Sequence, residues 1–321
     1  MSVISADASG CESIVPVYEE LLEKVPCPLC NGTDAEFKLS ACDRLYGQPG
    51  DYSLVECRDC HLKYVNPRPT FEGLARHYPP DYFASRPPEE SPFFLRPVQA
   101  LQAMGRIRTL ERMIGRFSPG QRVLDVGCGA NELVNQFRRM RKCEGIGVEF
   151  NSKVVEYVRT KRGLPIVEGT LRDAGFADAS FDLTTMMEYL EHEANPREVL
   201  LEARRVTRTG GHLAIEIPFI DGLPARVFGS RWATLDFPRH LVFFTPDTLK
   251  KMLAKCGFRL LRVEKFGVPL ALGISFATAL GYRRLNRMSS LEFLLMSLLS
   301  LPFAPFAPLL PEFMFAVAEA V

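Results

Sequence analysis

The chain has 321 residues, of which 47% are hydrophobic and 24% are charged. This length and composition allow one main domain with a sizeable core and a small appendage. The formal net charge of +1 gives no large field that attracts nucleic acid, so we expect no nucleic-acid partner. Residues 1–10 have neither the basic nor the apolar region of a secretory signal, which favours a cytoplasmic location.

Two cysteine pairs dominate the N-terminal part. A polar tail, residues 1–24, ends in a helical pattern from Val15 to Lys24, and residues 25–78 then contain Cys27-Pro-Leu-Cys30 and Cys57-Arg-Asp-Cys60. In a reducing compartment such pairs are typical of zinc ligands, and four thiolates complete a tetrahedral structural site. We therefore predict a zinc-ribbon-like module with the ligands Cys27, Cys30, Cys57 and Cys60. We expect buried or incidental thiols at Cys11, Cys42, Cys143 and Cys256.

Beyond the cysteine module the pattern changes to alternating helices and strands. Residues 79–97 contain six prolines and predict a semi-rigid linker. The alternation that follows predicts a doubly wound α/β domain with a parallel sheet, made of residues 98–266 and 312–321. Helices are expected at residues 98–117, 132–141, 152–161, 197–206 and 246–255. Strands are expected at residues 122–126, 145–149, 165–168, 181–186, 212–217, 259–266 and 312–318, with Gly210-Gly211 ending the connection before the fifth.

A glycine loop follows the first strand of this domain. The run Val123-Leu-Asp-Val-Gly-Cys-Gly129 lets a ligand approach bare backbone at the carboxyl end of the sheet. A dinucleotide fingerprint needs a third glycine where this chain has Glu132, which disfavours an NAD-dependent oxidoreductase. Glu149 ends the next strand, where a carboxylate accepts both hydroxyls of a ribose.

Further segments extend this pattern in the same order. They are Gly147-Val-Glu149, Phe181-Asp-Leu-Thr-Thr-Met-Met-Glu-Tyr-Leu-Glu-His192 and Val206-Thr-Arg-Thr-Gly-Gly211. With the glycine loop, they resemble the motifs of class I S-adenosylmethionine-dependent methyltransferases, in particular the group with the polyprenyl-quinone O-methyltransferases. The resemblance covers residues 120–265 and implies a Rossmann-like, seven-stranded sheet. The cysteine module and the segment from Trp232 to Thr245 resemble a related bacterial subgroup with varied substrates.

S-adenosylmethionine has no phosphates, so its loop needs glycines and a nearby acid, which this chain has in Asp125, Gly127 and Gly129. One departure from the resemblance is Asn131, where glycine is common, so the loop is expected to follow a slightly different path. The resemblance and the loop together give the expected cofactor-binding residues, which are Asp125, Gly127, Cys128, Gly129, Glu149, Phe150, Thr170, Leu171 and Met187.

Two sets of residues are candidates for catalysis. Glu188, Glu191 and His192 would share one face of a helical turn, where they would bind a divalent cation or exchange a proton. The resemblance implies a cation on such a Glu-x-x-Glu-His group, and bracing the loop is the structural alternative. His240 is a second candidate for proton transfer, or a loop histidine bonded to backbone. Trp232 and Phe237 are candidate walls of an apolar acceptor pocket, or core residues.

An apolar insert, residues 267–311, separates the last two expected strands. Two uncharged runs within it, residues 267–282 and 293–311, flank Arg283, Arg284 and Arg287. Four prolines in the second run argue against a simple membrane span. A helical insert is expected, and three roles stay open: peripheral membrane contact, a homodimer face, or a lid over an apolar substrate.

Together these features predict an S-adenosylmethionine-dependent methyltransferase of a small or lipid-like acceptor, of isoprenoid, quinone, sterol or glycolipid type. O-methylation and C-methylation both stay open. The expected cofactors are S-adenosylmethionine, a structural zinc ion and, as an option, a second divalent cation. The alternatives are the oxidoreductase and a non-catalytic zinc-ribbon binding protein with a vestigial methyltransferase domain.

Overall fold

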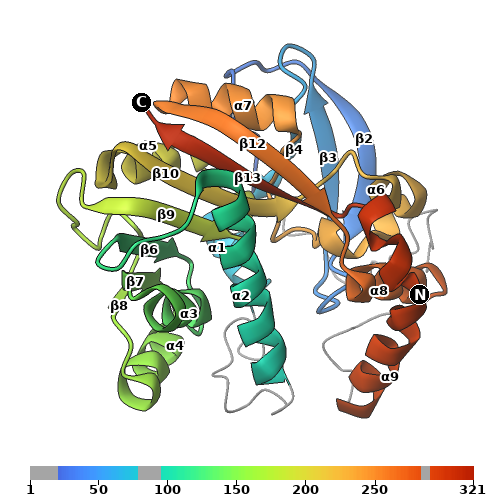
Figure 1. Ribbon diagram of the computed structural model, residues 1–321. Helices are drawn as coiled ribbons and strands as arrows, with labels where there is room; N and C mark the ends of the chain where they lie inside the picture. The colour runs from blue at the N-terminus through green and yellow to red at the C-terminus, as the bar shows by residue number, and fades with distance from the viewer. Residues whose placement is uncertain (1–20, 79–94, 283–289) are drawn as a thin grey trace, which may run out of the picture.

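A seven-stranded sheet lies at the centre of the protein (Figure 1). The structure, a computed structural model, describes residues 21–78, 95–282 and 290–321. The strand order is β12-β13-β10-β9-β6-β7-β8; β13 is antiparallel to both of its neighbours, and the other pairs are parallel. The strands are β6 (Arg122–Val126), β7 (Glu144–Glu149), β8 (Ile166–Glu168), β9 (Phe181–Met187), β10 (Thr207–Pro218), β12 (Phe258–Phe266) and β13 (Phe313–Ala320). The expected doubly wound, seven-stranded α/β fold is confirmed.

Helices cover both faces of this sheet. One face is covered by α2 (Leu95–Ile114) and α3 (Glu132–Arg141), and the other by α5 (Pro196–Val206) and α7 (Pro246–Lys255) (Figure 1). A shorter helix, α4 (Ser152–Tyr157), continues as a π-helical turn to Arg162 and packs beside β8. The central strands β6, β9 and β13 are therefore buried on both faces, as their apolar sequences require.

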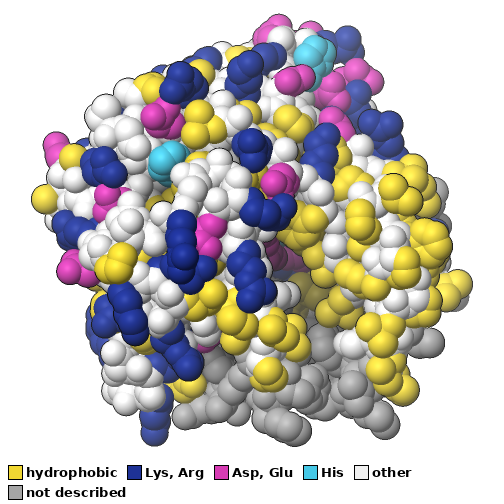
Figure 2. All heavy atoms as spheres, in the orientation of Figure 1, with side chains coloured by type: hydrophobic (Ala, Val, Ile, Leu, Met, Phe, Trp, Pro, Cys, Tyr) yellow, Lys and Arg dark blue, Asp and Glu magenta, His cyan; other side chains and the backbone are white. Residues whose placement is uncertain are grey.

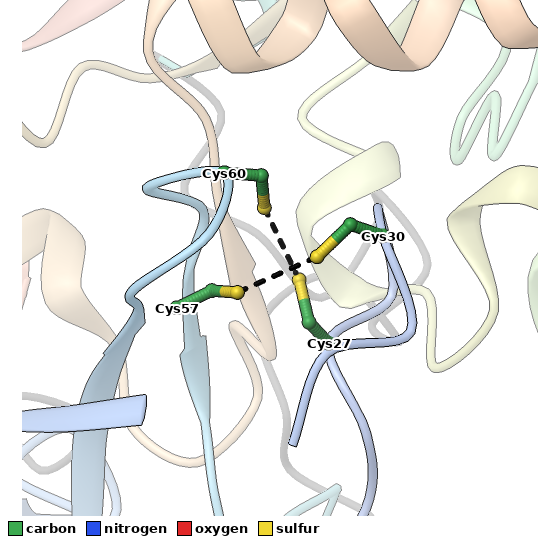
Figure 3. A group of neighbouring side chains, drawn as sticks. All are labelled: Cys27, Cys30, Cys57 and Cys60. Atoms are coloured by element: carbon green, nitrogen blue, oxygen red, sulfur yellow. Dashed lines mark hydrogen bonds between the residues drawn. The ribbon is translucent and has the colours of Figure 1, made fainter. Parts of the chain in front are cut away.

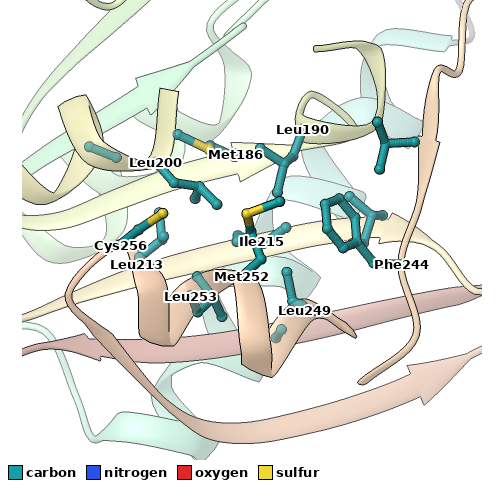
Figure 4. Close-up of a cluster of buried hydrophobic side chains, with 14 of the residues drawn as sticks. Met186, Leu190, Leu200, Leu213, Ile215, Phe244, Leu249, Met252, Leu253 and Cys256 are labelled. Carbon is teal, nitrogen blue, oxygen red and sulfur yellow. The ribbon is translucent and has the colours of Figure 1, made fainter. Parts of the chain in front are cut away.

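The core between the sheet and α7 shows why that helix forms where it does. Leu249, Met252 and Leu253 are buried on α7 at helical spacing, which gives the helix one apolar stripe. Figure 4 shows this stripe facing Met186 of β9 and Leu213 of β10. The helix begins with a capping box in which the side chains of Thr245 and Thr248 bond to each other's backbone N–H.

A second, four-stranded sheet combines the N-terminal module with a strand from much later in the chain. Its order is β11-β4-β3-β2, where β2 spans Ala35–Cys42, β3 Asp51–Cys57, β4 Lys63–Val65 and β11 Val242–Phe243. Val242 pairs with Tyr64 in antiparallel register. Nearby, β1 (Leu22–Glu23) pairs with β5 (Arg68–Pro69), and α1 (Phe71–Ala75) follows. The segment after β10 is therefore part of the N-terminal sheet.

Hydrophobic packing joins the two sheets as well. Leu62 and Tyr64 share one core with Phe244 and Leu249 of the α7 region. Tyr52 shares another with Trp232, Phe237 and Phe243, all in the segment between β10 and α7. The N-terminal sheet and the large domain are consequently packed on each other through apolar side chains.

The apolar insert is helical, as expected, in the part that the structure describes. It contains α8 (Pro269–Ala279), α9 (Ser290–Ser300) and a 3₁₀ segment, Leu301–Leu309. The Phe276 ring of α8 stacks on Phe303 at 5.0 Å and meets Phe228 edge-on at 4.9 Å. The last of these belongs to α6 (Leu223–Phe228). None of the described helices is both long and apolar enough to span a bilayer.

Several local expectations differ from the structure. Most of the helical pattern from Val15 to Lys24 and most of the linker lie outside the described residues, but Leu22–Glu23 form strand β1. Helix α2 already begins at Leu95, because Pro97 lies in its first turn, where the missing N–H breaks no bond. Strand β10 includes Gly210, whose φ of +74° accompanies a register shift. Cys42 is in a disulfide rather than an incidental thiol.

Candidate functional site

The glycine loop lies where β6 ends and the chain turns toward α3. Gly127 and Gly129 have φ angles of +68° and +50°, which glycine adopts without steric cost. A Cβ on Gly127 would lie 2.3 Å from the Tyr189 ring, whereas no described atom lies within 4 Å of the Cβ position of Gly129. The loop therefore has open space at Gly129 and an aromatic wall at Gly127, as the bare-backbone approach of a ligand requires.

Asn131 occupies a loop position where related proteins commonly have glycine, and it adopts the left-handed conformation there. Its φ is +61°, in the left-handed region that asparagine tolerates better than most residues. Its buried side chain donates from Nδ2 to the carbonyl of Pro165 at 2.8 Å. This bond fixes the loop against the segment that precedes β8.

Glu149 closes the loop from the neighbouring strand. Its Oε2 accepts the N–H of Gly129 at 3.0 Å, and its Oε1 accepts the N–H of Asn151 at 3.0 Å. Burial raises the pKa of this carboxyl, although the backbone N–H groups oppose the shift. Each oxygen keeps a second lone pair for a ribose hydroxyl. Beside it, the exposed Phe150 offers a free aromatic face at the carboxyl end of β7.

The other expected cofactor residues surround this corner. Thr170 starts a turn in which its N–H and hydroxyl both donate to Asp173, at 3.1 and 2.6 Å, and Leu171 is buried. Cys128 is next to Gly147, where an added Cβ would meet its sulfur at 2.3 Å. Met187 ends β9 and packs, half-buried, against the core under α2.

Asp125 belongs to a buried polar cluster that the sequence did not reveal. Thr185 donates to its Oδ1 at 2.6 Å, and burial raises the pKa of Asp125 to about 6. Arg106 of α2 lies nearby and bonds to Glu216 at 2.9 Å and to Glu188 at 2.8 Å. No local signal distinguishes Arg106 from the other arginines of α2, since its partners are more than 80 residues away in the chain.

Glu188 does not join Glu191 and His192, which corrects the expected three-residue face. Its φ is +55°, so the chain leaves β9 through a left-handed residue and forms only a short 3₁₀ turn, Leu190–His192. The carboxylate of Glu188 consequently pairs with Arg106, not with the other two residues. A helical spacing was the wrong geometry for this segment, because one positive φ resets the direction of the following side chains.

The structure instead brings His240 to the two remaining residues. Glu191, His192 and His240, here called the Glu191 group, have potential ligand atoms within 4.8 Å of one another. His240 Nδ1 lies 2.9 Å from the carbonyl of Thr234, and His192 Nδ1 lies 3.1 Å from the carbonyl of Arg239. A carbonyl only accepts, so both Nδ1 atoms carry protons and both Nε2 atoms keep a lone pair.

Burial disfavours charge on all three residues of the Glu191 group. Burial raises the pKa of Glu191 well above its usual range. Burial and the neighbouring His240 lower the pKa of His192 to about 3. Burial also lowers the pKa of His240. Neither carboxyl oxygen of Glu191 has a hydrogen-bond partner among the described residues. Asp236, whose Oδ2 lies 3.9 Å from His240 Nε2, stays ionised, because Arg239 lowers its pKa against the effect of burial.

The four knuckle cysteines converge as zinc ligands would (Figure 3). The Sγ atoms of Cys27 and Cys60 are 3.4 Å apart, as are those of Cys30 and Cys57, and all four lie within 4.8 Å of one another. Zn–S bonds of about 2.3 Å in a tetrahedron need similar spacings. Burial raises the pKa of Cys60 to about 11 and also raises that of Cys27, so a bound cation would be needed to keep them as thiolates. The residues therefore fit the ion.

The sheet order, the glycine loop and the acid at the end of β7 define the class of the S-adenosylmethionine-dependent methyltransferases. Residues 100–263 match the family described as a methyltransferase domain. That match covers half of the chain, and the protein belongs to this family.

The chain is similar to several named proteins. An O-methyltransferase of Aspergillus nomiae is 32% identical over 170 residues, which are 49% of this chain and 72% of that protein. A ubiquinone biosynthesis O-methyltransferase of Hahella chejuensis is 34% identical over 101 residues, 30% of this chain and 42% of that protein. A solved Haemonchus contortus phosphoethanolamine N-methyltransferase 2 is 16% identical, with a TM-score of 0.48 over 67% of this chain and 52% of that one. The chain spans 34% to 72% of the length of eight curated proteins that it matches.

Proposed function

We propose that the protein transfers the methyl group of S-adenosylmethionine to a hydroxyl oxygen of an apolar acceptor. The geometry of the Glu191 group carries this proposal, because it places a histidine whose Nε2 keeps a lone pair at the carboxyl edge of the sheet. The relatives named O-methyltransferases support an oxygen acceptor. S-adenosylmethionine supplies, when bound, a methyl group on a sulfonium that leaves as a neutral thioether.

The cofactor is assigned to the glycine loop and its surroundings. Gly127 and Gly129 admit it, Glu149 accepts the ribose hydroxyls, and Phe150 stacks on the adenine. Asp125, Cys128, Thr170, Leu171 and Met187 complete the proposed set. Arg106 of α2 is added to it, because its guanidinium lies beside Glu188 and Glu216 at the loop and can pair with a carboxylate of the cofactor.

His240 is the proposed general base. Its Nε2 takes the proton of the acceptor hydroxyl as the oxygen bonds to the methyl carbon. The imidazolium that forms is stabilised by ionised Asp236 at 3.9 Å, while Nδ1–H stays bonded to Thr234. The low pKa of His240 keeps this base unprotonated at neutral pH.

A second candidate role for the Glu191 group is a divalent cation site. The two unpartnered oxygens of Glu191 favour it, and so does the bonding of both Nδ1 atoms to backbone carbonyls, an arrangement common among metal-ligating histidines. A cation there would hold the acceptor oxygen and lower the pKa of its hydroxyl. Activity that is lost on dialysis against chelator and restored by Mg²⁺ or Mn²⁺, with the cysteine-bound zinc retained, would favour this role over the general base.

Calorimetric titration tests the cofactor, and a variant tests the base. We expect micromolar binding of S-adenosylmethionine and none of NAD; the opposite result would favour an oxidoreductase, and binding of neither would favour a non-catalytic protein. Labelled methyl transfer to a panel of phenols and long-chain alcohols then tests turnover.

His240→Gln should lower kcat by about 100-fold with unchanged cofactor affinity, whereas the exposed control His61→Gln should be unaffected. Equal kcat for His240→Gln and wild type would remove the base.

An apolar surface supports a lipid-like acceptor. On the insert, Leu280, Leu301 and Leu309 are exposed by 89%, 61% and 73%. Figure 2 shows hydrophobic side chains gathered over this part, at the right of the view. Residues 267–311 contain three arginines against one glutamate, which suits anionic headgroups. We assign this surface to peripheral contact with an anionic bilayer, from which the acceptor is taken.

Vesicle flotation tests the membrane contact. The protein should float with vesicles of phosphatidylglycerol and phosphatidylcholine, and less with phosphatidylcholine alone. A Leu280→Ser, Leu301→Ser, Leu309→Ser variant should lose flotation, while Phe71→Ser, which alters an equally exposed side chain on α1, should keep it. Failure of the wild type to float, together with sedimentation as a dimer that the triple variant disrupts, would assign the surface to a second copy of the chain.

A further inference from the structure

A fully buried arginine lies directly before the proposed base. The Arg239 side chain is 0% exposed. Its Nη1 donates to Asp43 Oδ2 at 2.7 Å and its Nη2 to Asp43 Oδ1 at 2.9 Å, so the two groups form a bidentate pair. The guanidinium also bonds to Asp236 through Nε, at 3.1 Å, and to the carbonyl of His77 at 3.0 Å. Its Cζ atom lies over the Tyr46 ring, 5.0 Å from the ring centroid.

The partner carboxylate comes from the N-terminal module. Asp43 follows β2, and the N–H groups of Leu45 and Tyr46 donate to its Oδ1. His77 Nδ1 lies 3.1 Å from Asp43 Oδ2, and His77 Nε2 lies 2.7 Å from the Tyr52 hydroxyl. Burial opposes the charge on Asp43, but His77 and Arg239 lower its pKa. Asp43 is thus an ionised, immobilised anchor inside the cysteine module.

The backbone of Arg239 connects this anchor to the Glu191 group. The carbonyl of Arg239 accepts the Nδ1–H of His192, which also lies 3.2 Å from the Tyr78 hydroxyl. Leu241, two residues later, donates to the carbonyl of Glu191 at 2.7 Å and accepts from Val65 of β4 at 2.9 Å. Every residue of the Glu191 group is therefore bonded to, or part of, the segment that Asp43 holds.

The energetics indicate what such a pair is for. Removing two charges from water costs several kcal/mol per ion, and a buried pair often stabilises a fold no more than apolar residues of the same size would. In some proteins a buried ion pair is retained because it selects one conformation of the chain over its alternatives. Here the arrangement that is fixed is the position of His240 and of the carbonyl that orients His192.

We propose that Asp43 and Arg239 are positioning residues of the methyltransferase site, so that the cysteine module is a component of the catalytic centre. This inference rests on the proposed function of the Glu191 group. Asp43 holds Arg239, Arg239 holds the segment from Asp236 to Leu241, and that segment sets the orientation of both imidazole rings. The rings meet edge-on at a centroid distance of 4.6 Å.

Asp43→Asn tests the proposal against a matched control. Asp221→Asn also breaks an ion pair between the module and the large domain, with Lys63 at 3.0 Å, but does not touch the segment. We expect Asp43→Asn to lower kcat between about ten- and hundredfold, with unchanged affinity for S-adenosylmethionine and a fully loaded zinc site. Asp221→Asn should keep kcat within about twofold of wild type, because this half-buried pair lies outside the segment.

A double variant and a spectroscopic measurement guard against unfolding. Asp43→Asn with Arg239→Gln removes both charges of the bidentate pair together, while Asp236 also loses its guanidinium partner. Circular dichroism and zinc content then show whether the variant is folded. Its kcat should still be low. Nitrogen NMR of the imidazoles should show the Nδ1–H tautomer at His192 and His240 in wild type and in Asp221→Asn. In the Asp43 variants it should show a mixture of the Nδ1–H and Nε2–H tautomers.

The outcomes separate this proposal from the proposed function. A folded double variant with wild-type kcat and unchanged histidine forms would overturn the positioning role. If the histidine tautomers changed in the Asp43 variants while these variants and His240→Gln kept full activity, Asp43 would still position the two histidines, but His240 would not be the catalytic base.

Discussion

Buried carboxyl groups in this protein differ in charge because their partners differ. Asp43 and Asp236 face the Arg239 guanidinium and have lowered pKa values. The carboxyl oxygens of Glu191 have no hydrogen-bond partner among the described residues, and the pKa of Glu191 is raised. Burial acts on all of them in the same direction. The neighbouring charge therefore decides whether the pKa of a buried carboxyl is lowered or raised.

Glu312 predicts a pH dependence of stability. Burial raises the pKa of Glu312 from 4.5 to about 8, although Trp232 Nε1–H donates to its Oε1 at 3.3 Å. Between these values the unfolded chain has lost the proton that the folded chain retains, so this group lowers stability as the pH rises from about 4.5 to 8. Glu312→Gln should remove that loss, and its gain in urea midpoint over wild type should increase from pH 5 to pH 8. The same gain at both pH values would show that Glu312 ionises normally; exposed Glu144→Gln serves as the control.

The two loop glycines should respond differently to alanine. Both substitutions strain a positive φ, which costs about 1 kcal/mol. Only Gly127→Ala also collides with the Tyr189 ring, so it should weaken S-adenosylmethionine binding by more than tenfold, and Gly129→Ala by less. Calorimetry measures both. If the two variants bound equally well, the Tyr189 ring would not wall the cofactor site.

At the scale of elements, local patterns predicted what local forces determine. The β6 strand and the α3 and α7 helices were expected at the residues where they occur, because their periodicity and caps are contained in a few neighbouring residues. Strand β11 is two residues long and pairs with β4 almost 180 residues earlier, so no periodicity marks it. The glycine loop, Glu149 and the four cysteines were found from spacing, while Asp43, Arg106 and Tyr78 were missed because their partners are distant in sequence.

The capping box of α7 makes a prediction at this scale. Thr245 Oγ1 accepts the N–H of Thr248 at 3.2 Å, and Thr245→Ala leaves that donor without its side-chain partner. The variant should lose about 1 kcal/mol of unfolding free energy, measured by urea denaturation. Thr33→Ala, at an exposed position, should change it by less than about 0.5 kcal/mol. A Thr245→Ala variant as stable as the wild type would mean that Pro246 and the apolar stripe are enough to start the helix.

In the described residues, the seven-stranded and four-stranded sheets form one packed unit. Trp232, the only tryptophan, shares a core with Tyr52 of the N-terminal sheet and bonds to Glu312 beside β13. A boundary between a module and a domain would cut through this core and through the β11–β4 pairing. Stability should therefore be shared between the cysteine site and the methyltransferase sheet.

Metal removal tests whether the cysteine site and the methyltransferase sheet unfold together. Chelation of a zinc ion held by the four cysteines should lower the melting temperature of the whole chain and not only of a minor part, because ligand binding to the folded state stabilises everything that unfolds with it. Trp232 fluorescence and far-ultraviolet circular dichroism should shift together, as in a two-state transition. A tryptophan transition that stays unchanged after metal loss, while thiol titration shows four new cysteines, would indicate that the module unfolds alone.

The late arrival of β11 also has a consequence for biosynthesis. At about 5–20 residues per second, the ribosome needs roughly 10 s or more after β4 has been made before Val242 and Phe243 are available. During that interval the nascent N-terminal sheet has an open edge at β4, and Asp43 has no guanidinium to pair with. A chain arrested before this point would present an unprotected strand to chaperones or to other nascent chains.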